Sequence, residues 1–276
     1  MAVIAMTREM ATLGKDVAQG LAERLKLEVV HHELVEHDIA ERSGLRESEV
    51  HRFLEGEASL LERWRINRKK LSHYTAQEIL ELAARGNVLI RGWGATYLLR
   101  SIPHVVCVRI CAPMQFRARV LMKRMGIAEP VAARREIERN DAAHNGTMQR
   151  LFAIDWKDPT LYAVTLNTAR IAPADCVEHI TRLCESDAFK ESPDSRAALM
   201  DQLIEARVHS ALGQLSDASL HAVGIDVQVK DGKVVLSGAI SDDKLIADIV
   251  RRVHAVDGVT DVKSQIHYLA FARMSE

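Results

Sequence analysis

Residues 3–16 read Val-Ile-Ala-Met-Thr-Arg-Glu-Met-Ala-Thr-Leu-Gly-Lys-Asp, and this stretch decides the fold. A short apolar run leads into a loop that ends in Gly14 and Lys15, and apolar residues at helical spacing start at Val17. A strand that enters a helix through such a loop directs several backbone N–H groups at one point, where the helix dipole and a lysine add positive potential. The stretch therefore predicts a loop that binds phosphate.

The loop departs from the common phosphate-loop pattern G-x-x-x-x-G-K-[ST] at two positions. Glu9 stands at the first glycine, and Asp16 stands at the serine or threonine. A carboxylate at residue 16 adds negative charge beside the phosphates, where the pattern has a hydroxyl. The alternative interpretation is a plain strand-to-helix turn in which Gly14 meets a steric requirement, and the motif alone leaves this alternative open.

Around this stretch, the first two thirds of the chain alternate short apolar runs with helical patterns. The expected strands are residues 2–6, 87–91, 105–111 and 160–167. The expected helices are residues 15–25, 34–43 and 60–84, and two more that begin at Pro113 and Pro130. Strands separated by helices predict an α/β fold, with a parallel sheet flanked by helices.

The composition is typical of a folded protein and argues against several classes. Of the 276 residues 47% are hydrophobic, and 37 basic residues nearly balance 38 acidic ones, so the net charge is −1. That balance gives no reason to expect binding to nucleic acid. No apolar run reaches the roughly 18 residues that a membrane helix needs, and the apolar start, Met1–Met6, is too short for a secretory signal. We therefore expect a cytoplasmic protein with no transmembrane segment and reduced cysteines.

A polar segment with one proline, Ser186–Ser195, separates two differently patterned regions. We expect a first domain over residues 1–185, a linker over 186–196 and a second domain over 197–270. The expected elements of the second domain are a helix at 197–215, strands at 223–229 and 234–238, a helix at 245–253 and a strand at 262–268. The order α-β-β-α-β, with a hairpin turn at Asp231-Gly232, predicts a small α+β domain.

The first region resembles the cytidylate-kinase-like family of P-loop proteins over most of residues 1–185. The matching stretches are Thr7-Arg8-Glu9 with Gly14-Lys15, Val88-Leu89-Ile90-Arg91-Gly92, Ala112-Pro113 with Arg117, Asp155-Trp156, and Leu166-Asn167-Thr168. The resemblance implies a P-loop kinase fold that transfers phosphate from ATP, with Mg²⁺, to a nucleoside monophosphate such as cytidylate.

The chain departs from that family at several functional positions. Ala11 and Leu13 stand in a loop that the family makes glycine-rich, and a leucine at positive φ is costly, so we expect the loop to wrap a triphosphate less well. The arginine-rich lid expected after Asp141 is replaced by Ala142-Ala143-His144. These losses leave a second hypothesis open, in which the domain is a catalytically degenerate nucleotide sensor or scaffold.

The candidate site residues follow from the loop and from the clustered arginines. We expect nucleotide binding by Thr12, Gly14, Lys15, Asp16 and Arg91, and catalysis by Lys15, Arg117 and Arg135. Guanidinium groups bind phosphate in a bidentate manner, which supports the arginines, although a solvated helix face paired with Glu136 and Glu138 explains the same pattern. No metal site is expected, because His31, His32 and His37 lack zinc-ligand spacing.

The second region resembles a BON domain. The matching residues are Val227, Lys230-Asp231-Gly232-Lys233-Val234, Leu236-Ser237-Gly238, Ala247, Val253, Val256, Gly258-Val259 and Val262. The resemblance implies a bacterial protein with a binding module, whose partner is a phospholipid, a small ligand or another protein. Nothing in the region suggests catalysis, because it lacks a nucleophile with a base, an acid pair and a metal cluster. An oligomerisation module is the alternative.

Overall fold

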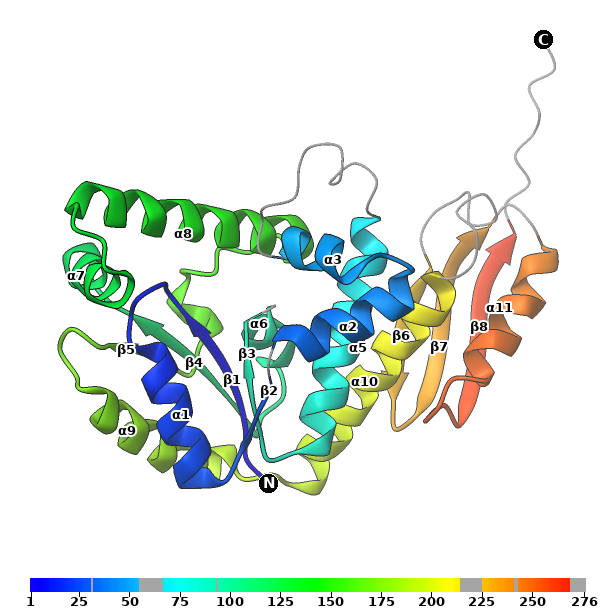
Figure 1. The fold of residues 1–276 in the computed structure, drawn as a ribbon. Helices are drawn as coiled ribbons and strands as arrows, with labels where there is room; N and C mark the ends of the chain where they lie inside the picture. Colours follow the sequence, from blue (N-terminus) through cyan, green and yellow to red (C-terminus); the bar gives the residue numbers. More distant parts are fainter. Residues whose placement is uncertain (31, 55–66, 93, 214–224, 241–242, 269–276) are drawn as a thin grey trace, which may run out of the picture. The chain divides into compact units, whose positions relative to one another are not determined.

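The structure is a computed structural model of the chain, and it describes residues 1–30, 32–54, 67–92, 94–213, 225–240 and 243–268. The chain divides into two compact units, Met1–Ser195 and Arg196–Glu276 (Figure 1). The polar segment 186–195 holds a short 3-10 helix at Asp187–Phe189 and the start of helix α10 (Pro193–Gly213). None of the helices that the structure describes combines the length and the apolar character of a membrane span.

The first unit is built on a five-stranded parallel sheet. Its strands are β1 (Val3–Arg8), β2 (Glu28–Val30), β3 (Val88–Arg91), β4 (Val105–Cys111) and β5 (Val164–Asn167). Their order in the sheet is β2-β3-β1-β4-β5. Every neighbouring pair is parallel, which confirms the predicted sheet. Because the strands are parallel, the loop after β1 meets the ends of β3, β4 and β5 at one edge.

Helices flank this sheet, as the sequence predicts. They are α1 (Gly14–Leu25), α2 (His32–Ser43), α3 (Glu47–Leu54), α5 (Arg68–Arg85), α6 (Ala95–Leu99), α7 (Met114–Met125), α8 (Pro130–Phe152) and α9 (Pro173–Glu185). Part of the predicted helix 60–84, residues 60–66, lies outside the described residues. The strand predicted at 160–167 is shorter, because Pro159–Leu161 form a 3-10 turn that Asp158 caps.

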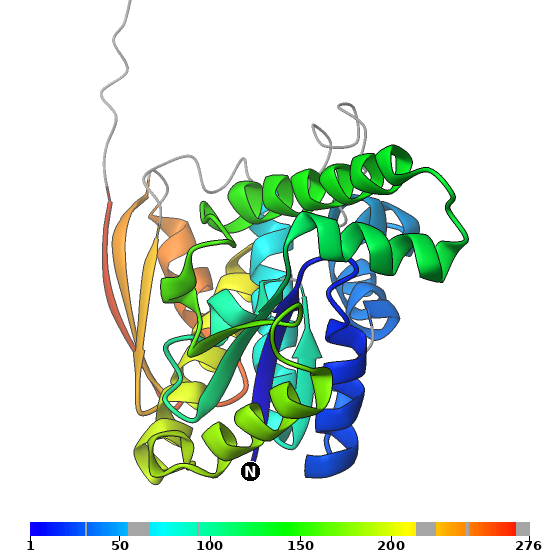
Figure 2. The same cartoon turned by 90° about the vertical axis from the view of Figure 1, so that its left-hand side faces the viewer.

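The central strand β1 fixes the arrangement of the sheet. Its buried residues Ile4 and Met6 share one core cluster with Val17 and Leu21 of α1 and with apolar side chains of β4 and α9. A strand covered on both faces is a nearly continuous apolar run, which is the pattern of residues 3–6. Figure 2 shows the unit from the side, with α1 and α9 next to each other and α8 lying across the edge where the strands end.

The second unit is the small α+β domain that the sequence predicts. The part of α10 from Arg196 onward is followed by β6 (Asp226–Lys230), β7 (Lys233–Ile240), α11 (Lys244–His254) and β8 (Asp261–Tyr268). Strand β7 is central, antiparallel to β6 and parallel to β8. The β6–β7 turn has φ of 50° at Asp231 and 75° at Gly232, which confirms the predicted hairpin.

Candidate functional site

The loop between β1 and α1 adopts a strained backbone. Ala11 has a φ of 60° and Leu13 a φ of 56°, so both residues lie in the left-handed region although neither is glycine. A left-handed residue with a side chain costs roughly 1–2 kcal/mol. The loop therefore takes the shape that glycines usually allow, despite the cost that the sequence predicts. Such strain persists only where surrounding contacts hold it.

This backbone shape leaves a row of amides available. Among the described residues, the N–H groups of Met10–Lys15 donate no hydrogen bond, whereas those of Asp16 and Val17 donate to the carbonyl of Leu13 at 3.0 and 3.2 Å. A left-handed residue followed by a helical one forms a concave nest of N–H groups that binds anions. Gly14 is required by space, because a Cβ there would lie 2.9 Å from Cβ of Arg8.

Two threonines hold the loop in place. The hydroxyl of buried Thr12 donates to the carbonyl of Glu9 at 2.8 Å, so it is engaged within the loop. The hydroxyl of Thr168, just after β5, donates to the carbonyl of Thr12 at 2.6 Å. The sequence alone assigns no role to Thr168, because this residue lies 156 residues after Thr12 along the chain.

A buried charge network lies beside the loop. Glu9 accepts a hydrogen bond from Arg109 at 2.5 Å and lies 3.4 Å from Arg117. The Nε of Arg117 donates to the carbonyl of Met10 at 2.7 Å, and its two terminal nitrogens bind both oxygens of Asp141 at 2.8 and 2.7 Å. The predicted catalytic residue Arg117 is thus buried, with partners in the loop and in α8.

The other predicted site residues differ in their environments. Lys15 and Asp16 are exposed in the first turn of α1, next to the available amides. Arg91 is half-buried where β3 ends, its Nε is without a hydrogen-bond partner in the described structure, and burial lowers the pKa of its guanidinium. Arg135 is exposed in α8, and no contact in the described structure joins it to the loop.

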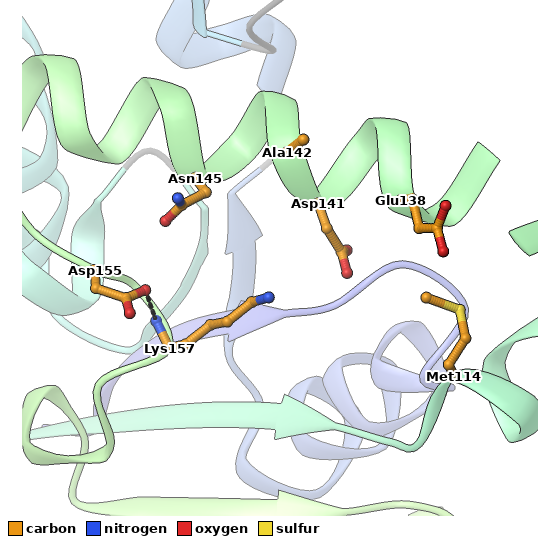
Figure 3. A pocket seen from close by; sticks show the side chains of 7 residues that line it. All are labelled: Met114, Glu138, Asp141, Ala142, Asn145, Asp155 and Lys157. Atoms are coloured by element: carbon orange, nitrogen blue, oxygen red, sulfur yellow. Dashed lines mark hydrogen bonds between the residues drawn. The ribbon is translucent and has the colours of Figure 1, made fainter. Parts of the chain in front are cut away.

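A cavity of about 400 Å³ opens between α8 and the loop that follows it (Figure 3). Its lining residues are Met114, Glu138, Asp141, Ala142, Asn145, Asp155 and Lys157. The side chain of Lys157 extends into the cavity towards Asp141, and its backbone N–H donates to Asp155 at 2.9 Å. Because three carboxylates line this space, it suits hydrogen-bond donors better than phosphate. No periodic pattern in the sequence predicts a role for Lys157 or Asn145.

Unpartnered polar atoms gather beside this cavity. The Nε of Arg109, Nε2 of His144, Oδ1 of Asn145 and Nε1 of Trp156 are buried without a hydrogen-bond partner in the described structure. His144 and Trp156 meet edge to face, with ring centroids 4.4 Å apart. Burial lowers the pKa of His144 to about 4, so its ring is neutral at pH 7. Buried polar atoms without protein partners are rare in folded proteins, and a bound water, an ion or a catalytic role accounts for them.

A group of three side chains of metal-ligand type lies elsewhere, on α2. Ligand atoms of His37, Asp38 and Glu41 lie within 4.8 Å of one another, and two of the three residues are exposed. The Nδ1 of His37 also lies 2.6 Å from Glu47. His31 falls outside the described residues. Exposed acidic groups often cluster without binding metal, so this cluster carries no assignment.

The family comparison agrees with this geometry. Residues 3–170, which include the loop, the charge network and the cavity, match the model of the cytidylate kinase-like family. The chain belongs to the cytidylate kinase-like family. Residues 200–270 match the BON domain, so the second unit is a BON domain that follows the kinase-like one.

Relatives of this cytidylate kinase-like chain are similar to it at low identity. The cytidylate kinase of Methanocaldococcus jannaschii is 25% identical over 156 residues, which cover 56% of this chain and 81% of that protein. The cytidylate kinase of Pyrobaculum aerophilum is 25% identical over 193 residues, which cover 70% of this chain and 98% of that protein. A crystal structure of an uncharacterized protein from Eubacterium ventriosum shares the fold, with a TM-score of 0.53, 16% identity, and coverage of 67% of this chain and 99% of that one.

Proposed function

We propose that the first unit binds a nucleotide by its phosphates and transfers a phosphoryl group from ATP to a nucleoside monophosphate, of which cytidylate is the first candidate. The amides of residues 10–15 and the ammonium of Lys15 would hold the phosphates at the start of α1. Arg91 and Arg135 would balance the charge of the reacting groups. A reaction that consumes ATP agrees with the cytoplasmic location expected from the sequence.

The observation that carries this proposal is the left-handed backbone at Ala11 and Leu13. A plain strand-to-helix turn has no need of two strained residues that together cost roughly 2–4 kcal/mol. A loop that must aim its amides at an anion does need this shape. The strain therefore favours phosphate binding over a plain strand-to-helix turn, even though Ala11 and Leu13 stand where glycines are usual.

The residues present allow a magnesium ion, with one difference from the usual pattern. Thr12 engages its hydroxyl on Glu9, and exposed Asp16 offers a carboxylate where a hydroxyl is usual. Carboxylate oxygens are good Mg²⁺ ligands. The ion would neutralise charge that develops on the phosphates. Asp16 is the residue of this loop that would hold it.

Turnover with a panel of acceptors tests the proposal. We expect the full chain to convert ATP to ADP in the presence of one nucleoside monophosphate, with CMP tried first. Lys15→Ala should lower the rate by about a hundredfold, because one preorganised charge contact stabilises the transition state by roughly 3 kcal/mol. Lys26→Ala, at the end of the same helix α1, removes an exposed lysine far from the loop and should keep the wild-type rate.

A second candidate function is a degenerate sensor or scaffold that binds nucleotide without turnover. The replacement of the lid arginines by Ala142, Ala143 and His144 favours this candidate. ADP binding without ATP consumption for any acceptor would select it. In that case the protein would act through the BON domain, which would bind the partner.

We propose that the BON domain is a binding module for a phospholipid, a small ligand or a protein. Its resemblance to known BON domains supports this, whereas its acidic net charge disfavours anionic lipid. Co-sedimentation of the full chain with vesicles of zwitterionic or anionic phospholipid tests whether the ligand is a phospholipid. Absence of binding to both vesicle types would leave a small ligand or a protein as the binding partner.

A further inference from the structure

The charge network beside the phosphate loop has a feature that the proposed function leaves unexplained. Arg117 uses its nitrogens on two different elements, the loop and α8. Its side chain is only 4% exposed, and that of Asp141 only 14%. Breaking such a buried pair is costly, because it leaves one charge without its partner. This contact therefore constrains both elements that it joins.

The loop needs such a constraint, because Ala11 and Leu13 do not favour their observed conformation. Strained residues keep their backbone angles only where neighbouring contacts over-determine them. Met10, immediately before Ala11, accepts the hydrogen bond from Arg117 at 2.7 Å. Glu9, one residue earlier, is held by Arg109 at 2.5 Å and by the amide of Ala112 at 3.3 Å.

We propose that Arg117 is a positioning residue that, with Asp141 and Glu9, holds the phosphate loop in its strained, amide-presenting shape. In other loops, glycines allow left-handed backbone because they have no side chain. Here the network stabilises left-handed residues that keep their side chains. Asp141 belongs to α8 and also lines the cavity, so Arg117 joins the loop to a helix that lines the cavity. This inference rests on the proposed nucleotide binding for its function, but the loop geometry can be measured without nucleotide.

The competing role for Arg117 is direct binding of phosphate, and the two roles predict opposite effects of one substitution. Asp141→Asn removes a charge while it keeps the side-chain size. If Arg117 positions the loop, Asp141→Asn weakens the binding of ADP by about tenfold. If Arg117 is a phosphate ligand held by Asp141, the same substitution frees it, and ADP binds equally well or more tightly.

Arg117→Lys gives a second contrast. A lysine keeps the charge but cannot reproduce the planar fork that bridges Met10 and Asp141. The positioning role predicts that Arg117→Lys and Arg117→Met weaken ADP binding to a similar extent. A phosphate-binding role predicts that Arg117→Lys keeps most of the affinity. The matched control is Glu136→Gln, which removes a carboxylate of α8 that pairs with exposed Arg139 and should leave ADP binding unchanged.

Hydrogen exchange measured without nucleotide separates this inference from the proposed function. The amides of Asp16 and Val17 donate to the carbonyl of left-handed Leu13, so their exchange reports on the loop shape. We expect about tenfold faster exchange at these amides in Asp141→Asn and no change in Glu136→Gln. Unchanged exchange in Asp141→Asn overturns the positioning role. Failure of the wild-type chain to bind ADP overturns the proposed function alone, and the exchange result still decides the role of Arg117.

Discussion

At the scale of single residues, His144 shows how burial sets charge in this molecule. Its ring lies against Trp156, and its Nε2 has no hydrogen-bond partner within the described structure. Burial is the main cause that lowers its pKa from 6.5 to about 4, with nearby Arg8 acting in the same direction and Asp141 against it. Between pH 4 and pH 6.5, the folded state therefore keeps the ring of His144 neutral, whereas the unfolded chain protonates it.

This pKa predicts acid sensitivity of the first unit. Between pH 6.5 and pH 4 the unfolded state binds a proton that the folded state rejects, so stability is present above pH 6.5 and is lost as pH falls. The loss between pH 7 and pH 5 should be about 2 kcal/mol, and His144→Phe should remove it while keeping an aromatic contact. All three tryptophans, Trp64, Trp93 and Trp156, belong to the first unit, so fluorescence during urea unfolding at the two pH values measures the effect. Equal losses in the wild type and in His144→Phe would contradict it.

The phosphate loop shows which residue-scale features the sequence could predict. Gly14 and Lys15 after an apolar run predict a strand that enters a helix through a loop, which the structure has, because that signal is local. Binding of an anion by this loop stays a prediction, since the motif alone is also explained by a plain strand-to-helix turn. The left-handed backbone at Leu13 was not predictable, because leucine disfavours it and the contacts that hold the loop come from Arg117, Asp141 and Thr168. A local pattern cannot reveal a conformation that distant residues stabilise.

At the scale of helices and strands, prediction worked where apolar periodicity was strong. Strand β4 was predicted with its observed bounds, 105–111, and α1 differs from its prediction by one residue. Short elements such as α3 and α6 were not predicted, since fewer than nine residues give little periodic signal. The cavity residues Asn145 and Lys157 are brought together by the return of the chain after α8, which no periodic pattern encodes.

The β6–β7 hairpin of the BON domain depends on one helix contact. Buried Asp201 of α10 accepts hydrogen bonds from the amides of Asp231 and Gly232 at 3.0 and 3.1 Å. Asp201→Ala removes both acceptors, so we expect a loss of about 1–3 kcal/mol in the stability of this unit. Faster hydrogen exchange in β6 and β7 would measure it.

A surface pair of the same unit provides the control for that experiment. Asp257 pairs with Arg207 at 2.6 Å, and its side chain is 88% exposed. Because water screens such pairs, Asp257→Ala should cost less than about 1 kcal/mol. An effect of Asp201→Ala as small as that of Asp257→Ala would show that the turn is stable without its helix contact.

At the scale of the whole molecule, the chain combines two units with different expected ligands. A ligand that binds only the folded first unit should stabilise that unit by mass action, and ADP at 100 times its dissociation constant adds about 2.7 kcal/mol. We expect ADP to shift the tryptophan transition, which reports on the first unit, and to leave hydrogen exchange in β6, β7 and β8 unchanged. This expectation follows from the division of the chain into two compact units, Met1–Ser195 and Arg196–Glu276. A shift of both signals by the same free energy would instead show that the two units unfold as one, and that nucleotide bound at the phosphate loop is sensed by the BON domain.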